Sequence, residues 1–303
     1  MSRIFVIVNA ASGSGSDEEL SHHVQGLFES AGIPAEVYLA RGGEQIAARI
    51  KDAIAQQADV IVAGGGDGTV SMVAAALAGG DIALGILPLG TLNHFAKDLG
   101  LPLALDEAVR EIASGRRLRV DVGEVNGRVF VNNSSLGLYP DIVYERDREQ
   151  QRVGRGKWLA FLRATVAALR KYPFLNVSLE VDGRKHQRRT PIVFIGNNEY
   201  RMQGLALGER VSLTGGRLSL YTTQRSGRLR LVQLALRALA GLLKQARDFD
   251  ALLATEIVVE SGHQHLRVAT DGEITVMTSP LRYRIRPGSL TVLGAVTPGA
   301  KGR

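Results

Sequence analysis

The residues best placed to do chemistry lie in a glycine-rich segment that directly follows an apolar run. Gly65, Gly66 and Gly68 surround Asp67, and Thr69 comes next. Glycine lacks a Cβ atom and tolerates a positive φ, so a phosphate can approach the backbone N–H groups at the start of the next helix, where the helix dipole also attracts it. Asp67 would repel that phosphate unless a divalent cation or a transferable proton lay between them. Asp67 is therefore a candidate catalytic residue.

A simpler interpretation is that the glycines make a tight turn and that Asp67 caps the following helix. A second segment, ILPLGTLNHFAKDLGLP, favours the phosphate interpretation, because it also leaves an apolar strand through a glycine and a threonine, Gly90 and Thr91. Asn93 lies just beyond and can donate a hydrogen bond from its amide. The N-terminal segment NAASGSGS is a third polar, glycine-rich exit from a strand.

These segments need a scaffold that brings strand ends together. In the first hundred residues, apolar strand patterns (RIFVIVN, AEVYLA, DVIVAG and IALGILP) alternate with helix patterns at 17–31, 44–57 and 69–79. Such alternation predicts βαβ units and a parallel sheet, and ligands bind beyond the carboxyl ends of its strands. All three glycine-rich exits fall at such ends.

From about residue 116 the pattern changes to short alternating strands joined by hairpins. The dipeptides Asn126-Gly127 and Asp182-Gly183 are strong hairpin signals. This half predicts an antiparallel β-sandwich, interrupted by helices at about 156–171 and 228–247. The second of these helices is basic and amphipathic, so it either covers the sandwich or contacts lipid.

Composition narrows the class of partner. The formal net charge is +7, which favours phosphates or anionic head groups, but only 5% of residues are aromatic and no DNA-binding motif occurs, so we expect no nucleic acid. There is no cysteine, no apolar run of transmembrane length and no signal-peptide pattern. We therefore expect a cytoplasmic protein that can act at the inner membrane face.

Other phosphate-binding and hydrolase motifs are missing from the sequence. The chain has no Walker A run, no G-x-G-x-x-G opening a helix, no kinase catalytic-loop signature and no G-x-S-x-G elbow. The sequence therefore supports neither a Walker nucleotide-binding protein nor a Rossmann dehydrogenase nor a serine hydrolase of the G-x-S-x-G type.

Four segments, GGGDGTV, PLGTLNHFAKDLGLP, NNSSLGL and DGE, together resemble the diacylglycerol kinase catalytic-domain family, specifically its bacterial lipid kinases related to diacylglycerol and sphingosine kinases. The resemblance covers essentially the whole chain. It implies an N-terminal α/β nucleotide-binding domain, residues 1–115, and a C-terminal β-sandwich domain for the lipid substrate, residues 116–295, with ATP in the cleft between them. Residues 296–303 form a tail.

The resemblance also assigns roles to individual residues. Asp271 and Glu273 match the late D-G-E, whose acids the family uses to abstract the proton of the lipid hydroxyl or to hold catalytic Mg²⁺; the sequence does not divide these roles. Ala10 replaces the usual proline of the N-terminal loop. The residues that match the ATP-binding motifs are Asn9, Ser12, Gly13, Gly65, Gly66, Asp67, Gly68, Thr69, Gly90, Thr91 and Asn93.

The chain departs from the family pattern at several positions. His94 stands where aspartate is commoner, and Ala40 stands where a nucleotide-contacting threonine is usual. Thr214, Gly215 and Ser219 replace acids in a stretch that helps bacterial relatives hold a structural Mg²⁺. Since a hard cation needs charged oxygen ligands, we expect this second metal site to be absent or weak.

The expected function is an ATP- and Mg²⁺-dependent lipid kinase that phosphorylates a hydroxyl of a lipid, such as diacylglycerol or a sphingoid base, at a membrane surface. Two alternatives remain. One is a phosphotransferase similar to NAD kinases that acts on a soluble substrate, and the other is a non-catalytic sensor of nucleotide or lipid. The sequence leaves the oligomeric state open, and a homodimer is compatible with it.

Overall fold

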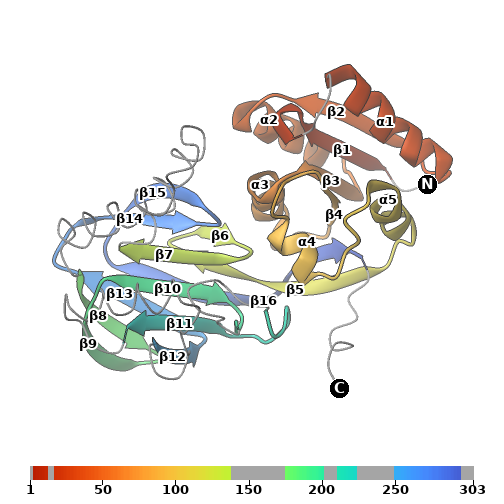
Figure 1. The fold of residues 1–303 in the computed structure, drawn as a ribbon. Coiled ribbons are helices and arrows are strands. Elements are labelled where there is room, and N and C mark those ends of the chain that lie inside the picture. The colour runs from red at the N-terminus through yellow and green to blue at the C-terminus, as the bar shows by residue number, and fades with distance from the viewer. Residues whose placement is uncertain (1–2, 13–16, 138–174, 201–209, 224–248, 295–303) are drawn as a thin grey trace, which may run out of the picture.

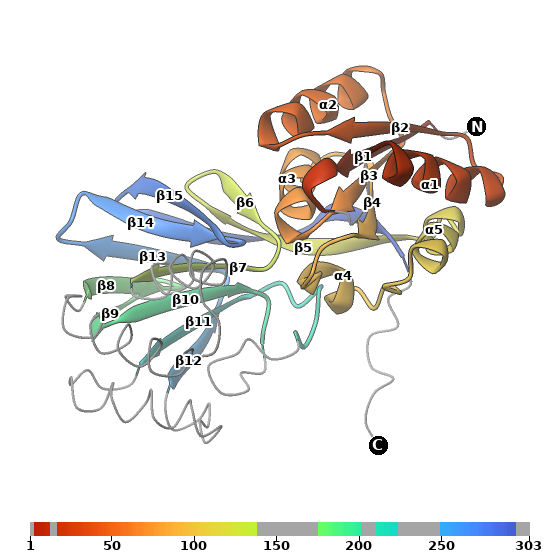
Figure 2. The same cartoon turned by 45° about the horizontal axis from the view of Figure 1, so that its top comes forward.

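The computed structural model describes residues 3–12, 17–137, 175–200, 210–223 and 249–294 (Figure 1). The predicted helices at 156–171 and 228–247, the tail at 296–303 and Gly13 lie outside the described residues. An α/β part and a part built from antiparallel strands lie side by side in Figures 1 and 2. The predicted fold class is thus confirmed.

The N-terminal part contains the predicted parallel strands, in the order β2-β1-β3-β4. The helices α4 and α5, which the sequence patterns did not indicate, complete it. The elements are β1 (Ile4–Asn9), the short 3-10 helix η1 (Ala10–Ser12), α1 (Asp17–Ser30), β2 (Ala35–Ala40), α2 (Gly43–Ala55), β3 (Val60–Gly65), α3 (Asp67–Leu77), β4 (Ala83–Pro88), α4 (His94–Asp98) and α5 (Leu105–Ala113).

The central strands are buried on both faces because their side chains alternate between two apolar layers. Phe5 and Ile7 of β1 pack in one layer with α2 and α3. Val6 and Val8 pack in the other layer with α1 and α5. This burial fixes the register of the sheet and therefore the place where its carboxyl ends meet.

The C-terminal part is a sandwich. A six-stranded antiparallel sheet has the order β12-β11-β10-β7-β14-β15, and the strands β5, β6, β8, β9, β13 and β16 form the other layer. The sequence patterns missed β12. The strands are β5 (Arg117–Val125), β6 (Arg128–Phe130), β7 (Asn133–Gly137), β8 (Leu175–Val181), β9 (Arg184–Thr190), β10 (Ile192–Asn197), β11 (Leu218–Thr223), β12 (Phe249–Ala254), β13 (Glu256–Ser261), β14 (His265–Thr270), β15 (Glu273–Thr278) and β16 (Leu281–Leu293).

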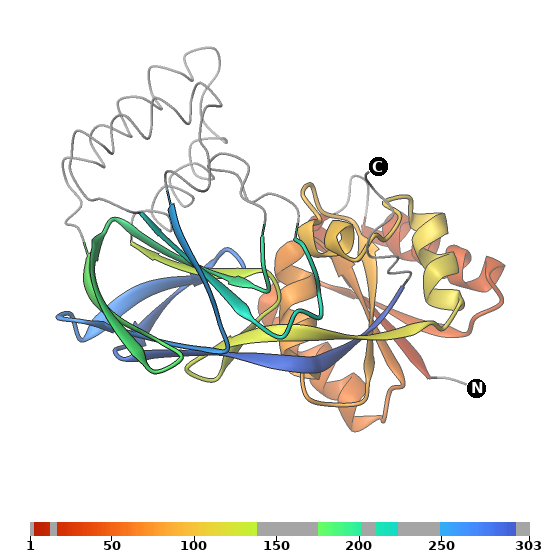
Figure 3. The same ribbon diagram turned by 90° about the horizontal axis from the view of Figure 1, so that it is seen from below.

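The strand β16 joins the two parts, as Figure 3 shows. It pairs with β13 of the sandwich, runs antiparallel to β5, and reaches β4 of the parallel sheet, where Val292 lies opposite Leu84. The segment LRYRIRP predicts a strand that ends at Pro287. The strand β16 continues beyond it because a bulge between Arg286 and Leu290 accommodates the proline. One sheet therefore crosses the predicted domain boundary after residue 115, which stays a prediction.

Both predicted hairpin turns are confirmed. Asn126 and Gly127 have φ of 46° and 85°, and Asp182 and Gly183 have φ of 44° and 81°, as a type I′ turn requires. The Asp182 carboxylate also accepts hydrogen bonds from the neighbouring strand: from the N–H and hydroxyl of Thr255 at 3.0 Å each, and from the N–H of Glu256 at 3.1 Å. Desolvation is the largest single effect and opposes these donors, but the donors together outweigh it and lower the pKa of Asp182.

Replacing Asp182 by asparagine keeps the turn but removes a charge that these donors stabilise. Because the folded-state pKa of Asp182 is lowered, its contribution is present above the unfolded-state pKa and is lost as the pH falls through the folded-state pKa. We expect Asp182→Asn to reduce the unfolding free energy by about 1 kcal/mol at pH 7 and by less in acid. Urea titrations from pH 3 to 7 measure this; a difference independent of pH would contradict it.

Candidate active site

The predicted phosphate-binding segments meet at the carboxyl edge of the parallel sheet. Gly65, the last residue of β3, lies opposite Pro88, the last residue of β4, and β1 ends beside them at Asn9. The Asn9 side-chain amide donates a hydrogen bond to the Thr69 hydroxyl at 3.2 Å. The N-terminal segment and the first glycine segment are thus joined directly.

The glycines of the two segments allow the loops to pack together. A Cβ atom on Gly65 would lie 2.5 Å from the Thr69 hydroxyl, and one on Gly90 would lie 2.4 Å from the Cα atom of Gly66. None of Gly64, Gly65, Gly66 and Gly68 has a positive φ. The sequence-based explanation was therefore wrong on that point: Gly65 is required by close contact with Thr69 in its own segment, and Gly90 by close contact with Gly66 of the other segment.

Gly68 differs from these glycines. It is exposed, and a Cβ atom there would meet no atom within 4 Å. It lies in the first turn of α3, whose N-cap residue is Gly66 and has no side-chain capping hydrogen bond. The first N–H groups of α3 are thus free donors at the positive end of the helix dipole, which is the arrangement that favours phosphate binding.

Asp67 is the first residue of α3 rather than its cap, so the simpler interpretation of this residue lacks support. Its carboxylate accepts a long hydrogen bond, 3.4 Å, from the N–H of Phe95 in α4. Ser71 lies one turn further along α3, on the same face.

Asn93 holds the second segment in shape. It has a left-handed conformation, φ 51°, and its side chain accepts a hydrogen bond from the Gly90 N–H at 3.1 Å. Its amide donates to the carbonyls of Gly90 and Pro88, at 2.7 and 3.2 Å. Both amide hydrogens are therefore used within the loop. Thr91 is exposed beside it, and Ser12 is half-buried at the end of η1.

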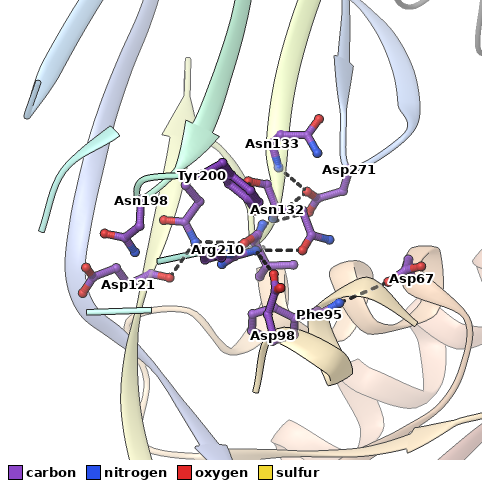
Figure 4. A network of polar contacts seen from close by, with 12 residues as sticks. Asp67, Phe95, Asp98, Asp121, Asn132, Asn133, Asn198, Tyr200, Arg210 and Asp271 are labelled. Carbon is purple, nitrogen blue, oxygen red and sulfur yellow. Dashed lines mark hydrogen bonds and ion pairs between the residues drawn. The ribbon is translucent and has the colours of Figure 1, made fainter. Parts of the chain in front are cut away.

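The structure places Asp271 at a third hairpin turn. Asp271 and Gly272, between β14 and β15, have φ of 49° and 87°. The Asp271 carboxylate accepts three backbone hydrogen bonds, from Val131 at 2.8 Å, Asn132 at 2.8 Å and Asn133 at 3.0 Å (Figure 4). These three N–H groups, residues 131–133, are called the Asp271 cradle below.

Asp182 and Asp271 occupy the same kind of turn, but their pKa values are shifted in opposite directions. Burial raises the pKa of the Asp271 carboxyl, although the N–H groups of the cradle oppose the rise. The pKa of the exposed Asp182 is lowered. The Ser71 hydroxyl of α3 is close enough to lower the pKa of Asp271 somewhat, although its geometry falls short of a full hydrogen bond. Asp271 thus faces α3, and its environment suits a proton acceptor.

Glu273 opens β15 two residues later, and its environment differs. Its side chain is 69% exposed and forms an ion pair with Arg128 of β6 at 2.6 Å. No group of three acidic, histidine or cysteine side chains suited to a metal ion occurs among the described residues. Since the cradle and Arg128 already engage both acids, Mg²⁺ fits here only with most of its oxygen ligands taken from phosphates and water.

Sequence reasoning missed Asp121 of β5, which is 2% exposed. Its carboxylate accepts hydrogen bonds from the N–H groups of Gly216 at 2.7 Å and Gly288 at 2.8 Å, next to the stretch for which a weak second metal site was predicted. In that stretch the Ser219 hydroxyl donates to the carbonyl of Asn198 at 2.6 Å. Weak metal binding there stays a prediction. A lone aspartate in a strand gives no motif by which to find it.

A second missed group lies between the two parts of the molecule. Arg210 pairs with Asp98 of α4, their side-chain atoms 2.9 Å apart, and donates to the side chain of Asn132 at 2.9 Å. The two partners lie 112 and 78 positions away in sequence, so no local pattern could have identified them.

Residues 3–125 match the model of the diacylglycerol kinase catalytic domain, and residues 142–294 match that of the YegS C-terminal NAD kinase beta sandwich-like domain. The chain belongs to the family that combines a diacylglycerol kinase catalytic domain with a YegS C-terminal NAD kinase beta sandwich-like domain. The family assignment supports a kinase role for this enzyme.

Named relatives agree with the family. A diacylglycerol kinase of Bacillus subtilis is 28% identical over 247 residues, which cover 80% of each chain. A probable lipid kinase YegS-like protein of Citrobacter koseri is 35% identical over 138 residues, 44% of this chain and 46% of that protein. A crystal structure of a diacylglycerol kinase from Bacillus anthracis covers 98% of both chains with a TM-score of 0.71 and 22% identity, which supports the fold.

Gly90 and Gly68 give a matched test of the two kinds of glycine. Gly90→Ala places a Cβ atom against the backbone of Gly66, so we expect the unfolding free energy to fall by about 1–3 kcal/mol. Gly68→Ala meets open space in a helix, so its stability should equal or exceed the wild type by up to about 1 kcal/mol. Chemical denaturation compares them; equal stability of the two variants would contradict the packing argument.

Proposed function

We propose that this family member is an ATP- and Mg²⁺-dependent lipid kinase, which transfers the γ-phosphate of ATP to a hydroxyl of a lipid such as diacylglycerol or a sphingoid base. The observation that carries the proposal is the pairing of two features across the site. The uncapped start of α3 suits a phosphate, and the partly buried Asp271, whose pKa is raised by desolvation, lies beside the same helix.

In the proposed reaction the lipid hydroxyl oxygen attacks the γ-phosphorus, the bond to the leaving ADP oxygen breaks, and the hydroxyl proton passes to the Asp271 carboxylate. The N–H groups of the first turn of α3 hold phosphate oxygens, and Gly68 leaves room for them. Mg²⁺, when bound, neutralises charge on the phosphates. Asp67 is the acid of the N-terminal part nearest to these groups, and Glu273 is held at the other side by Arg128.

The lipid is proposed to be met at a membrane surface, with the protein in the cytoplasm at the inner membrane face. The family names of the relatives support a lipid acceptor. In the part of the chain that the structure describes, no helix is long and apolar enough to cross a membrane.

The first experiment is transfer of label from γ-labelled ATP, with Mg²⁺, to diacylglycerol, a sphingoid base or phosphatidylglycerol in mixed micelles, and to NAD in solution. Label in an extractable lipid supports the proposal. Label on NAD supports a soluble-substrate kinase, and ATP binding without any labelled product supports a sensor; either result would overturn the lipid kinase assignment.

Asp271→Asn tests the proposed base. Asparagine can keep the left-handed turn but cannot accept the proton, so we expect label transfer to the lipid to fall by about 10²- to 10⁴-fold. Asp182→Asn is the matched control, because it makes the same change in the same type of turn far from the cradle, and its activity should equal the wild type. Transfer by Asp271→Asn within a few-fold of the wild type would refute the role.

Asp67→Ala tests the acid at the start of α3. We expect turnover to be lost while the fold persists, because Gly66 rather than Asp67 occupies the cap position. If Asp67 served only as a local helix stabiliser, its removal would cost about 0.5–2 kcal/mol of stability and leave the rate unchanged. Label transfer and thermal unfolding, measured on the same preparation, separate the two outcomes.

A further inference from the structure

Arg210 is a buried cation between the two parts of the molecule. Its side chain is 1% exposed, and that of its partner Asp98 is 17% exposed. One nitrogen, Nη2, makes both the ion pair with Asp98 and the hydrogen bond to the side-chain oxygen of Asn132 (Figure 4). Asp98 belongs to α4 of the N-terminal part, whereas Asn132 precedes β7 of the sandwich. The guanidinium therefore bridges the two parts.

Aromatic rings complete the surroundings of the guanidinium. Its central carbon lies 5.0 Å from the ring centre of Tyr200 and 5.8 Å from that of Phe95. Its Nε and Nη1 atoms are buried without a hydrogen-bond acceptor. A buried arginine with unused donors is costly, and cation–π contact offsets only part of that cost. Stability of the fold alone therefore does not explain why an arginine is buried at this position.

Asn132 connects Arg210 to the proposed base. Its side chain receives the hydrogen bond from Arg210, and its backbone N–H donates to the Asp271 carboxylate at 2.8 Å. Its carbonyl accepts hydrogen bonds from the N–H of Asn197 at 2.8 Å and the hydroxyl of Tyr200 at 3.1 Å. Every polar group of Asn132 named here is thus engaged, so a displacement of the whole residue by its side-chain contact would also displace the N–H in the cradle.

The N-terminal end of the network reaches Asp67. Phe95 and Asp98 lie three residues apart, on one turn of α4. Phe95 donates its N–H to Asp67 and stacks near Arg210, while Asp98 pairs with Arg210. Because α4 has only five residues, it cannot hold its position without such contacts.

We propose that Arg210 is a positioning residue that couples α4 to the Asp271 cradle, so that Asp67 and Asp271 keep a fixed relation across the site. The structural part of this proposal stands on the contacts alone. Its consequence for catalysis rests on the proposed function.

Arg210→Lys is the central variant, because lysine keeps the charge beside Asp98 but lacks the planar guanidinium that packs between the rings of Tyr200 and Phe95 and carries Nη2 to both partners. Arg284→Lys is the matched control. Arg284 pairs with Glu124 at 2.7 Å in the same part of the molecule but makes no contact with the network.

The first readout is hydrogen exchange at backbone amides, which requires no activity. In Arg210→Lys we expect the amides of the Asp271 cradle to exchange about tenfold faster, as loss of one hydrogen bond allows. The amides of Thr255 and Glu256, which bind Asp182, should be unchanged and serve as an internal control against general destabilisation. Unchanged exchange in the cradle, or equal acceleration at both places, would overturn the coupling.

The second readout is the pH dependence of label transfer to the lipid. A weakened N–H donor stabilises the Asp271 carboxylate less, so its pKa rises further and the acidic limb of the kcat profile moves to higher pH. The apparent KM for ATP should change less than about twofold, because the start of α3 is untouched. A fall in kcat at all pH values without a moved limb would indicate a merely structural role and overturn the catalytic part.

Other charged groups near Asp271 could also move the acidic limb of the kcat profile if their charge changed. The charged or titratable groups that surround the network are Asp67, His94, Asp98, Arg128, Tyr200, Arg210, Asp271 and Glu273. Arg210→Lys alters the charge of none of them, so a moved limb reports the geometry of the cradle. If the wild type labels no lipid, the proposed function fails, yet the exchange measurement still decides whether Arg210 holds the cradle.

Discussion

The contact of the partly buried Asp271 carboxylate with three backbone N–H groups is the interaction on which the site depends. Burial alone would keep this group protonated, and three donors alone would keep it strongly acidic. Together they hold an acid in one orientation with a pKa above its usual range. Such a group can accept a proton and return it, which is the property that phosphoryl transfer to a neutral hydroxyl requires.

The fold supplies the other half of the site through simple geometry. Parallel strands end at one edge of their sheet, so three glycine-containing segments meet there. Close backbone contact between Gly66 and Gly90 then fixes the loops, and the internal hydrogen bonds of Asn93 fix the second one. The start of α3 is left uncapped and open at Gly68. Glycines of the same motifs therefore have different roles: Gly66 and Gly90 allow the loops to pack together, and Gly68 leaves space for a ligand.

Local patterns in the sequence were enough to predict the parallel strands, the antiparallel sandwich and the Asx-Gly turns, because burial on two faces and left-handed turns leave a signal within a few residues. The extension of β16 beyond Pro287 depends on pairing with β5 and β4, which lie far away in sequence. The pair Asp98 and Arg210 depends on how the two parts pack. The turn role of Asp271 could have been predicted, since Asp271-Gly272 repeats the pattern of Asp182-Gly183.

The most direct test of the account is a crystal structure of the protein with Mg²⁺ and a nonhydrolysable ATP analogue. The account predicts phosphate oxygens within hydrogen-bonding distance of the first N–H groups of α3, above Gly68, with the Asp271 carboxylate on the side where the lipid hydroxyl would enter. An analogue bound elsewhere, or a terminal phosphate that lies far from both α3 and Asp271, would contradict it.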